Sequence, residues 1–146
     1  MNVIKYSDCS SNNIIKSNLN LSKKTKLAVV PTTAGSGAEV TSNAVIYINK
    51  IKYSLEGENL IPNYFSLIPQ ILVKNKNKLK SSAGFDAISQ AVESIISVKS
   101  TSDSLKFAYK SLDLSLSNYI DFLKKPSISN SNNMALAAMY SGKAIS

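Results

Sequence analysis

The spacing of hydrophobic and polar positions changes along this chain. Between residues 26 and 68 the apolar residues come in short runs bounded by turn-forming or polar residues, which is typical of β-strands. The two middle runs flank Asn49-Lys50, and this arrangement predicts a two-stranded hairpin. We expect the first run, which ends at Pro31, to be a buried strand. The predicted strands are KLAVV (26–30), AVIYI (44–48), IKYSL (51–55) and YFSLI (64–68).

After Lys80 the apolar spacing becomes helical. A helix is predicted over 84–97, with a large apolar stripe that should face a helical core. Asp86, Gln90 and Glu93 lie on a different, narrower face of this helix. The apolar stripe consists of Phe85, Ile88, Val92, Ile95 and Ile96.

Two more helices follow. Ser102 and Asp103 are expected to cap the first, which Pro126 should stop. Caps within 129–133 precede MALAAMYSGKAIS, which predicts a last helix that is still apolar where the sequence stops. We therefore expect a truncated chain of marginal stability, with apolar side chains of the last helix left uncovered. The apolar set of the first is Leu105, Ala108, Tyr109, Leu112, Leu116, Tyr119, Ile120 and Leu123, and the uncovered set is Met134, Leu136 and Met139.

Composition narrows the class of protein. The chain has 146 residues, 44% of them hydrophobic, and no apolar run approaches the ~20 residues that cross a bilayer. Cys9 is the single cysteine, so no internal disulfide can form. The net charge of +8 comes from 17 lysines without any arginine, and the lysines are scattered rather than interleaved with aromatic residues. We expect a cytoplasmic protein whose partners include neither nucleic acid nor membrane.

The loop PTTAGSGAEVT (31–41) is the first candidate for chemistry. Its two glycines let backbone approach a ligand, and its hydroxyl groups can donate to phosphate or ribose. It has neither the GxGxxG spacing of a dinucleotide fingerprint nor the ending of a P-loop, so a plain connecting loop stays an alternative. SGKAIS (141–146) also departs from the P-loop pattern and is expected to be helical. The hydroxyl-bearing residues of the loop are Thr32, Thr33, Ser36 and Thr41.

Asp86 and Gln90 form the second candidate, because residues four apart lie on one helical face. Two oxygen ligands cannot complete a metal site, and a solvated polar face is the alternative interpretation. The chain contains no histidine, which excludes Ser-His-Asp and Cys-His nucleophile systems. No side chain is evident as a general acid or base, so no catalytic residue is assigned.

PTTAGSGAEVT, the hairpin with Lys52 and SAGFDAISQAVES together closely resemble the iron-containing (group III) alcohol dehydrogenase family. The similarity runs from about Lys26 to Ser146. It implies an incomplete two-domain dehydrogenase fold: an α/β nucleotide-binding domain with a β-hairpin, followed by an all-helical metal-binding domain. On this reading, residues 1–25 are an irregular lead-in, 26–80 end the first domain, and 81–146 begin the second.

The resemblance also implies a function: hydride transfer between NAD or NADP and a small aldehyde or alcohol, assisted by a divalent metal, Fe or Zn. The active site should lie in the cleft between the domains, and the complete enzyme should be a homo-oligomer. By position, Asp86 matches the first metal ligand and Gln90 the second, which is a histidine in most members. Lys52 matches a lysine that reaches the cofactor's ribose. Thr32, Thr33, Ser36 and Thr41 match the loop that contacts the cofactor.

The sequence departs from the family pattern in three ways. The upstream GGGS turn and the downstream pair of metal-binding histidines are absent, and Gln90 replaces a histidine. GFDAISQAVESIISVKSTS together with SGKAIS resembles a subgroup that includes phosphonoacetaldehyde reductases, in which glutamine stands at this position. We therefore expect a segment of a metal-dependent aldehyde reductase, inactive when isolated. The alternatives are a non-catalytic product of a broken gene and a small basic binding protein.

Overall fold

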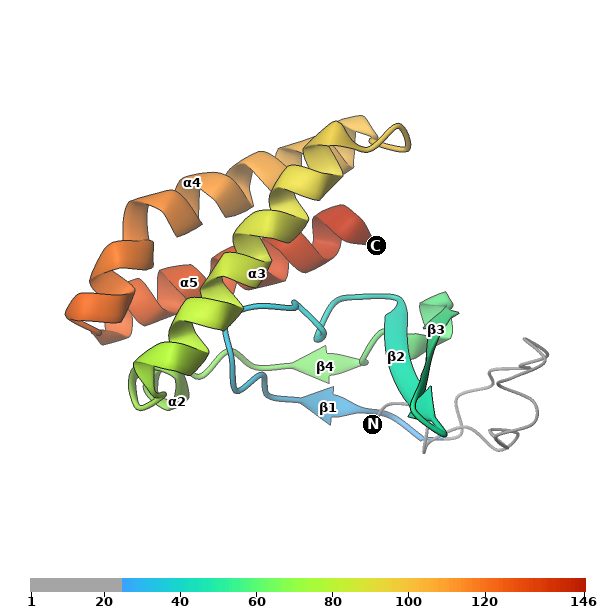
Figure 1. Cartoon of the computed structure of the whole chain (residues 1–146), viewed down its shortest axis with the longest axis horizontal. Coiled ribbons are helices and arrows are strands. Elements are labelled where there is room, and N and C mark those ends of the chain that lie inside the picture. The colour runs from blue at the N-terminus through green and yellow to red at the C-terminus, as the bar shows by residue number, and fades with distance from the viewer. Residues whose placement is uncertain (1–24) are drawn as a thin grey trace.

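The computed structural model describes residues 25–146, in which a few strands are followed by four helices (Figure 1). This order confirms the expected fold class. The predicted lead-in over residues 1–25 lies, except for its last residue, outside the described part. The strands are β1 (Ala28–Val29), β2 (Asn43–Ile48), β3 (Ile51–Glu56) and β4 (Tyr64–Phe65), with a 3-10 turn η2 (Glu58–Leu60) before β4. The helices are α2 (Pro69–Val73), α3 (Asn77–Ile96), α4 (Ser102–Lys124) and α5 (Ile128–Ile145).

Strands β1 and β4 form a parallel pair of two residues each, tied by the Asn63 side chain, which accepts a hydrogen bond from Leu27 N at 3.0 Å. The prediction of a buried strand over 26–30 was wrong, because Ala28 and Val30 are exposed. The run YFSLI likewise contributes only Tyr64 and Phe65, both exposed. Each strand has a single partner within residues 25–146. The apolar runs 26–30 and 64–68 are longer than the two-residue strands that they form.

Strands β2 and β3 form the predicted antiparallel hairpin. Asn49 and Lys50 have φ angles of 50° and 66°, the left-handed values that a tight two-residue turn requires. Alternation along the strands separates two faces. One face packs around Leu55 and Leu60, and the other carries Lys52 opposite Tyr47. Lys52 therefore points away from the hairpin's own small core.

The first long helix, α3, buries a different face from the one predicted. Its large apolar residues Phe85, Val92 and Ile96 are exposed, so three of the five residues of the predicted stripe do not face the core. Ile95, in contrast, packs against a buried cluster, as predicted. The helix also begins at Asn77, seven residues before the predicted start. Small side chains let the neighbouring helices approach closely: a Cβ at Gly84 would lie 2.7 Å from the Tyr119 ring. The buried face is Lys80, Gly84, Ala87, Ala91 and Ser94.

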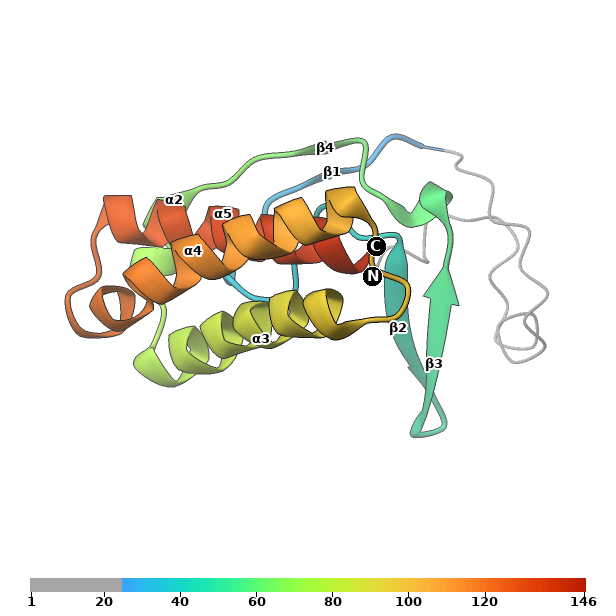
Figure 2. The same cartoon turned by 90° about the horizontal axis from the view of Figure 1, so that it is seen from above.

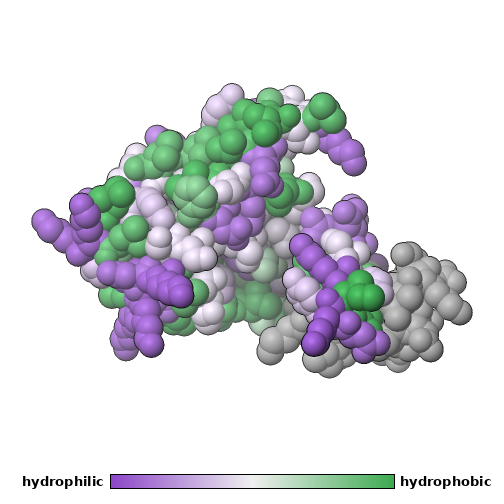
Figure 3. Space-filling model, in the orientation of Figure 1, coloured by the Kyte–Doolittle hydropathy of each residue, from purple (hydrophilic) through white to green (hydrophobic). Residues whose placement is uncertain are grey.

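Helix α4 ends at Lys124, as expected from Pro126, but its cap is Thr101 rather than Ser102 or Asp103. Thr101 and Ser104 exchange side chain to backbone hydrogen bonds in a capping box. The predicted apolar set of α4 combines residues of its buried face with residues of its exposed face. Its members Tyr109, Leu116 and Ile120 are exposed, whereas the buried residues are Ala108, Ser111, Ser115 and Phe122. Figure 3 shows apolar surface on the outer side of the helices.

Helix α5 also begins earlier than predicted, capped by Ser127 instead of a residue within 129–133. Met134 and Met139 are buried, so the expectation that they are left uncovered was wrong. Leu136 is partly buried. SGKAIS is helical through Ile145, as predicted. Between residues 25 and 146 no helix combines the length and apolar character that a membrane span needs.

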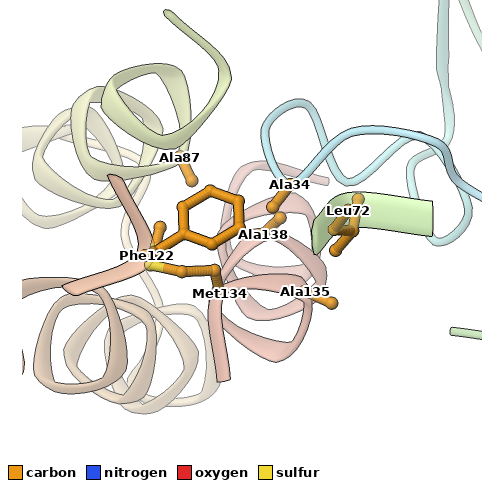
Figure 4. Close-up of a cluster of buried hydrophobic side chains, with 7 residues drawn as sticks. All are labelled: Ala34, Leu72, Ala87, Phe122, Met134, Ala135 and Ala138. Carbon is orange, nitrogen blue, oxygen red and sulfur yellow. The ribbon is translucent and has the colours of Figure 1, made fainter. Parts of the chain in front are cut away.

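The main core surrounds Phe122, whose ring lies at the centre of the cluster in Figure 4. Ala34, from the loop after β1, belongs to this core together with residues of the helices. The loop is therefore anchored in the helical part of the molecule. The other buried members are Leu72, Ala87, Met134, Ala135 and Ala138.

Candidate functional site

The loop over residues 31–42 passes between α3 and α5 on its way from β1 to β2 (Figures 1 and 2). Two of its glycines touch helix backbone: a Cβ at Gly35 would lie 2.9 Å from Ala83 O, and one at Gly37 would collide with Ala138 O. Gly37 also has a φ of 59°, which favours glycine. On the helix side, Gly142 permits the contact with Gly37. These contacts hold the loop backbone against the two helices. The side chains of Thr32 and Ser36 remain exposed on the loop.

The loop, the hairpin and α3 enclose a cleft of about 680 Å³, within the range of small-molecule sites. Five of the predicted site residues line it together: Ser36, Thr41, Lys52, Asp86 and Gln90. The predicted arrangement, with Asp86 and Gln90 facing the glycine-rich loop across a cleft, is confirmed as geometry. Their roles as metal ligands and cofactor contacts stay predictions. The remaining lining residues are Ala38, Asn43, Ala44, Val45, Ser54 and Ile145.

Thr32 and Thr33 do not line this cleft. Both line a neighbouring cavity beside β1, which also contains Ser36 and Glu39. A third hollow connects Thr33 and Ser36 with Asp86. Ser36 borders all three cavities. A bound molecule that extended from β1 to α3 would therefore pass next to Ser36.

Asp86 and Gln90 are in direct contact, since Gln90 Nε2 donates to Asp86 Oδ2 at 3.2 Å. Asp86 is exposed to the cleft, and Gln90 is partly buried. A carboxylate and an amide carbonyl are oxygen donors suited to a divalent cation. The contact between Nε2 and Oδ2 places the two side-chain groups close enough for both to reach one ion. The described residues contain no group of three or more acidic, cysteine or histidine side chains that could together hold a metal ion. The pair therefore fits a metal as two of its ligands, and further ligands have to come from elsewhere.

Glu93 is not part of this pair. It lies one turn further along α3 and lines a separate cavity with Glu56, Lys99 and Ser146. The polar face seen in the sequence is thus divided between two cavities. Only its first two members face the loop.

The cleft carries charges of both signs. Lys52 stands on the hairpin wall and Asp86 on the α3 wall. Beside the threonines, Glu39 is 4% exposed, and this burial raises the pKa of its carboxyl while a hydrogen bond from its own backbone lowers it to a smaller extent.

The sequence did not single out several residues that shape the site. Ser141 lies against the Gln90 amide, and Asn43 and Ser54 line the cleft beside Lys52. Strand alternation was a usable signal for the last two, because residues 43, 52 and 54 share one face of the hairpin. Nothing in the sequence pattern relates Ser141 to Gln90, which is 51 residues away.

Comparison with known proteins places this geometry in a family. The model of a family described as iron-containing alcohol dehydrogenase matches residues 3–69, which include the loop and the hairpin. The chain belongs to the iron-containing alcohol dehydrogenase family. Among curated relatives, 4-hydroxybutyrate dehydrogenase of Clostridium kluyveri is 27% identical over 84% of this chain and 33% of its own length. Phosphonoacetaldehyde reductase of Streptomyces viridochromogenes is 30% identical over 82% of this chain and 31% of its own length.

Solved structures agree with this placement. An iron-containing alcohol dehydrogenase from Thermotoga maritima superposes with a TM-score of 0.83 at 26% identity, covering 94% of this chain and 38% of that one. Sulfoacetaldehyde reductase from Bifidobacterium kashiwanohense, solved in complex with NAD+, gives a TM-score of 0.79 at 25% identity, covering 84% and 33%. The chain thus spans about a third of the length of these relatives.

Proposed function

We propose that this chain supplies the cofactor loop and two metal ligands of an NAD(P)H-dependent aldehyde reductase of the iron-containing alcohol dehydrogenase family. The observation that carries the proposal is the cleft in which Ser36, Thr41 and Lys52 face Asp86 and Gln90. Nucleotide-binding groups on one wall and cation-binding groups on the other would bring a hydride donor and a polarised carbonyl together. Family membership supports the reaction class.

Each wall has a distinct task. The loop hydroxyls and the Lys52 ammonium bind and orient the nucleotide, because they are donors that suit ribose and phosphate oxygens. Asp86 and Gln90 hold the metal, which supplies Lewis-acid polarisation of the substrate carbonyl. Thr41 is buried and Ser36 exposed, so Ser36 is the loop hydroxyl more accessible to a ligand.

We further propose that the natural substrate is a small aldehyde with an anionic group, phosphonoacetaldehyde being the leading candidate. Gln90, SVKSTS and SGKAIS support this choice through their resemblance to that subgroup, and the relative from Streptomyces viridochromogenes carries that name. Among the described residues, Lys52 is the one lysine that lines the cleft. A lysine on the wall of a partly enclosed cleft attracts anions to that wall more than scattered surface lysines do.

We also propose that the isolated chain lacks dehydrogenase activity, because it offers two ligands where a closed site needs at least three from protein. The test is therefore a chimera in which residues 26–146 replace the matching third of the Clostridium kluyveri 4-hydroxybutyrate dehydrogenase. We expect metal-dependent oxidation of NADH or NADPH by the chimera, with higher kcat/KM for phosphonoacetaldehyde than for a neutral aldehyde of similar size.

Asp86→Ala should abolish the chimera's activity, whereas Asp113→Ala, an exposed aspartate on α4, should leave it intact. Equal loss in both variants, or activity without added metal, would contradict the proposed role of the cleft. Equal kcat/KM for neutral aldehydes would remove the anion preference alone. An inactive chimera that still binds metal and cofactor would favour the non-catalytic alternative.

A further inference from the structure

The hydroxyl of Ser141 on α5 lies directly against the Gln90 amide. Ser141 is fully buried, and its Oγ is 2.9 Å from Ala138 O and 3.4 Å from Gln90 Oε1. A serine hydroxyl has one proton and therefore donates one good hydrogen bond. The shorter contact, to Ala138 O, has the better length, because O–H···O bonds cluster below about 3 Å. The hydroxyl proton therefore points mainly to Ala138 O, and the hydrogen bond from Ser141 to Gln90 Oε1 is weak.

The other end of the Gln90 amide faces Asp86. Nε2 donates to Asp86 Oδ2 at 3.2 Å, which places the amide nitrogen where a cation would attract an oxygen. Rotation of the amide by 180° exchanges its oxygen and nitrogen with little change in shape. In the rotated orientation Nε2 donates to Ser141 Oγ while Ser141 still donates to Ala138 O. Every donor near Ser141 then has its own acceptor.

The cost of the rotated orientation lies on the Asp86 side. Oε1 and the Asp86 carboxylate are both acceptors, and two facing acceptors repel unless a cation or a donor lies between them. With the amide nitrogen next to Asp86, the pair needs no cation, because Nε2 donates to Oδ2. With a divalent cation, the amide oxygen next to Asp86 becomes favourable. Ser141 is compatible with both, since a hydroxyl donates or accepts.

We propose that Ser141 is a positioning residue that holds the Gln90 amide nitrogen and so turns the amide oxygen toward a cation bound at Asp86. This rests on the proposed function of Asp86 and Gln90 as metal ligands. Histidine ligands are usually oriented through their second nitrogen by a neighbouring acceptor, and the loss of such a neighbour typically costs 10–100-fold in metal affinity. Ser141 does for a glutamine ligand what that acceptor does for histidine.

The chain offers a close control for this role. Ser131 lies on the same helix, is equally buried, and its Oγ has no hydrogen-bond partner among the described residues. Ser131→Ala therefore removes a buried hydroxyl from α5 without touching Gln90. Comparing Ser141→Ala with Ser131→Ala separates the loss of a hydroxyl from the loss of amide positioning.

The experiment measures Mn²⁺ affinity of the 146-residue chain by water-proton relaxation, for the wild type, Ser141→Ala, Ser131→Ala, Gln90→Ala and the double variant Gln90→Ala/Ser141→Ala. We expect about tenfold weaker binding in Ser141→Ala. Ser131→Ala should bind as the wild type does. In the Gln90→Ala background, Ser141→Ala should have no further effect, because the amide through which it acts is gone.

A second readout needs no substitution. In the wild-type chain, addition of diamagnetic Zn²⁺ should create nuclear Overhauser contacts between the Gln90 side-chain amide protons and Ser141 Hβ, absent in the metal-free protein. Wild-type binding with equal affinities in Ser141→Ala and Ser131→Ala, or without the new contacts, would overturn the role of Ser141 alone. No Mn²⁺ binding by the wild type at millimolar concentrations would overturn both this role and the proposed metal site.

Discussion

Gly37 of the glycine-rich loop and Gly142 of α5 pack backbone against backbone: a Cβ on Gly142 would lie 2.7 Å from Gly37 O. This contact joins the segment proposed to bind cofactor to a helix next to the proposed metal ligands. It also explains the glycine in SGKAIS, a string that superficially resembles a phosphate loop. The glycine serves close packing, and the helix continues through it.

The first prediction concerns the stability of this contact. Gly142→Ala should lower the free energy of unfolding by about 1 kcal/mol, because overpacking costs about 1–3 kcal/mol and the gain in helix propensity returns about 1. Gly37→Ala should cost more, since its φ of 59° adds strain without any helical gain. Gly57→Ala is the control, as Gly57 has extended backbone with φ 162°. Urea unfolding checks the order, and equal values for all three variants would contradict the contact.

The second prediction concerns pH. Burial raises the pKa of Glu39 above its ordinary value of 4.5, so the folded state holds this proton more tightly than the unfolded state. The stabilisation is complete below pH 4.5 and is lost as pH rises through the raised pKa. Glu39→Gln should therefore be more stable than the wild type at pH 7, and its advantage should vanish in acid. Glu58→Gln, at an exposed position, should show no such difference. Thermal unfolding between pH 4 and 8 measures both variants, and a pH-independent gap would contradict the assignment.

The third prediction concerns metal preference. Replacing the amide of Gln90 with imidazole should raise the ratio of Zn²⁺ to Mn²⁺ affinity about tenfold or more, because imidazole suits zinc better than a carbonyl oxygen does. The fold should be retained, since Gln90 is only partly buried. Gln70→His, the same change at an exposed position of α2, is the control. Equal ratios in the wild type and Gln90→His would show that Gln90 is not a ligand.

Local signals in the sequence predicted the hairpin and the cleft well. Asn49-Lys50 fits the left-handed turn, and the four-residue spacing put Asp86 beside Gln90. The predicted faces of α3 and α4 are largely wrong because the sequence pattern is dominated by large apolar residues, many of which are exposed. In α3 the buried face is made of small residues such as Gly84 and Ala91, whose role depends on helices distant in sequence. No single-helix pattern contains that information.

The same reason explains what was missed at the site. Ser141 meets Gln90 only because α5 packs against α3, and a sequence pattern gives no crossing point for two helices. The prediction of a buried strand at 26–30 is wrong for a related reason. Short apolar runs predict strand pairing, but they do not show which elements cover the paired strands. Glu93 was grouped with Asp86 by periodicity, yet it faces another cavity.

The central claim is that a divalent cation binds in the cleft between the loop and α3. Paramagnetic broadening by Mn²⁺ in ¹H–¹⁵N spectra of the labelled chain locates the ion directly. We predict that broadening centres on residues 86–90 and 36–41 and reaches Lys52, and that Asp86→Ala removes it while Asp113→Ala does not. Broadening centred on Glu56 and Glu93, or unchanged in Asp86→Ala, would contradict the account.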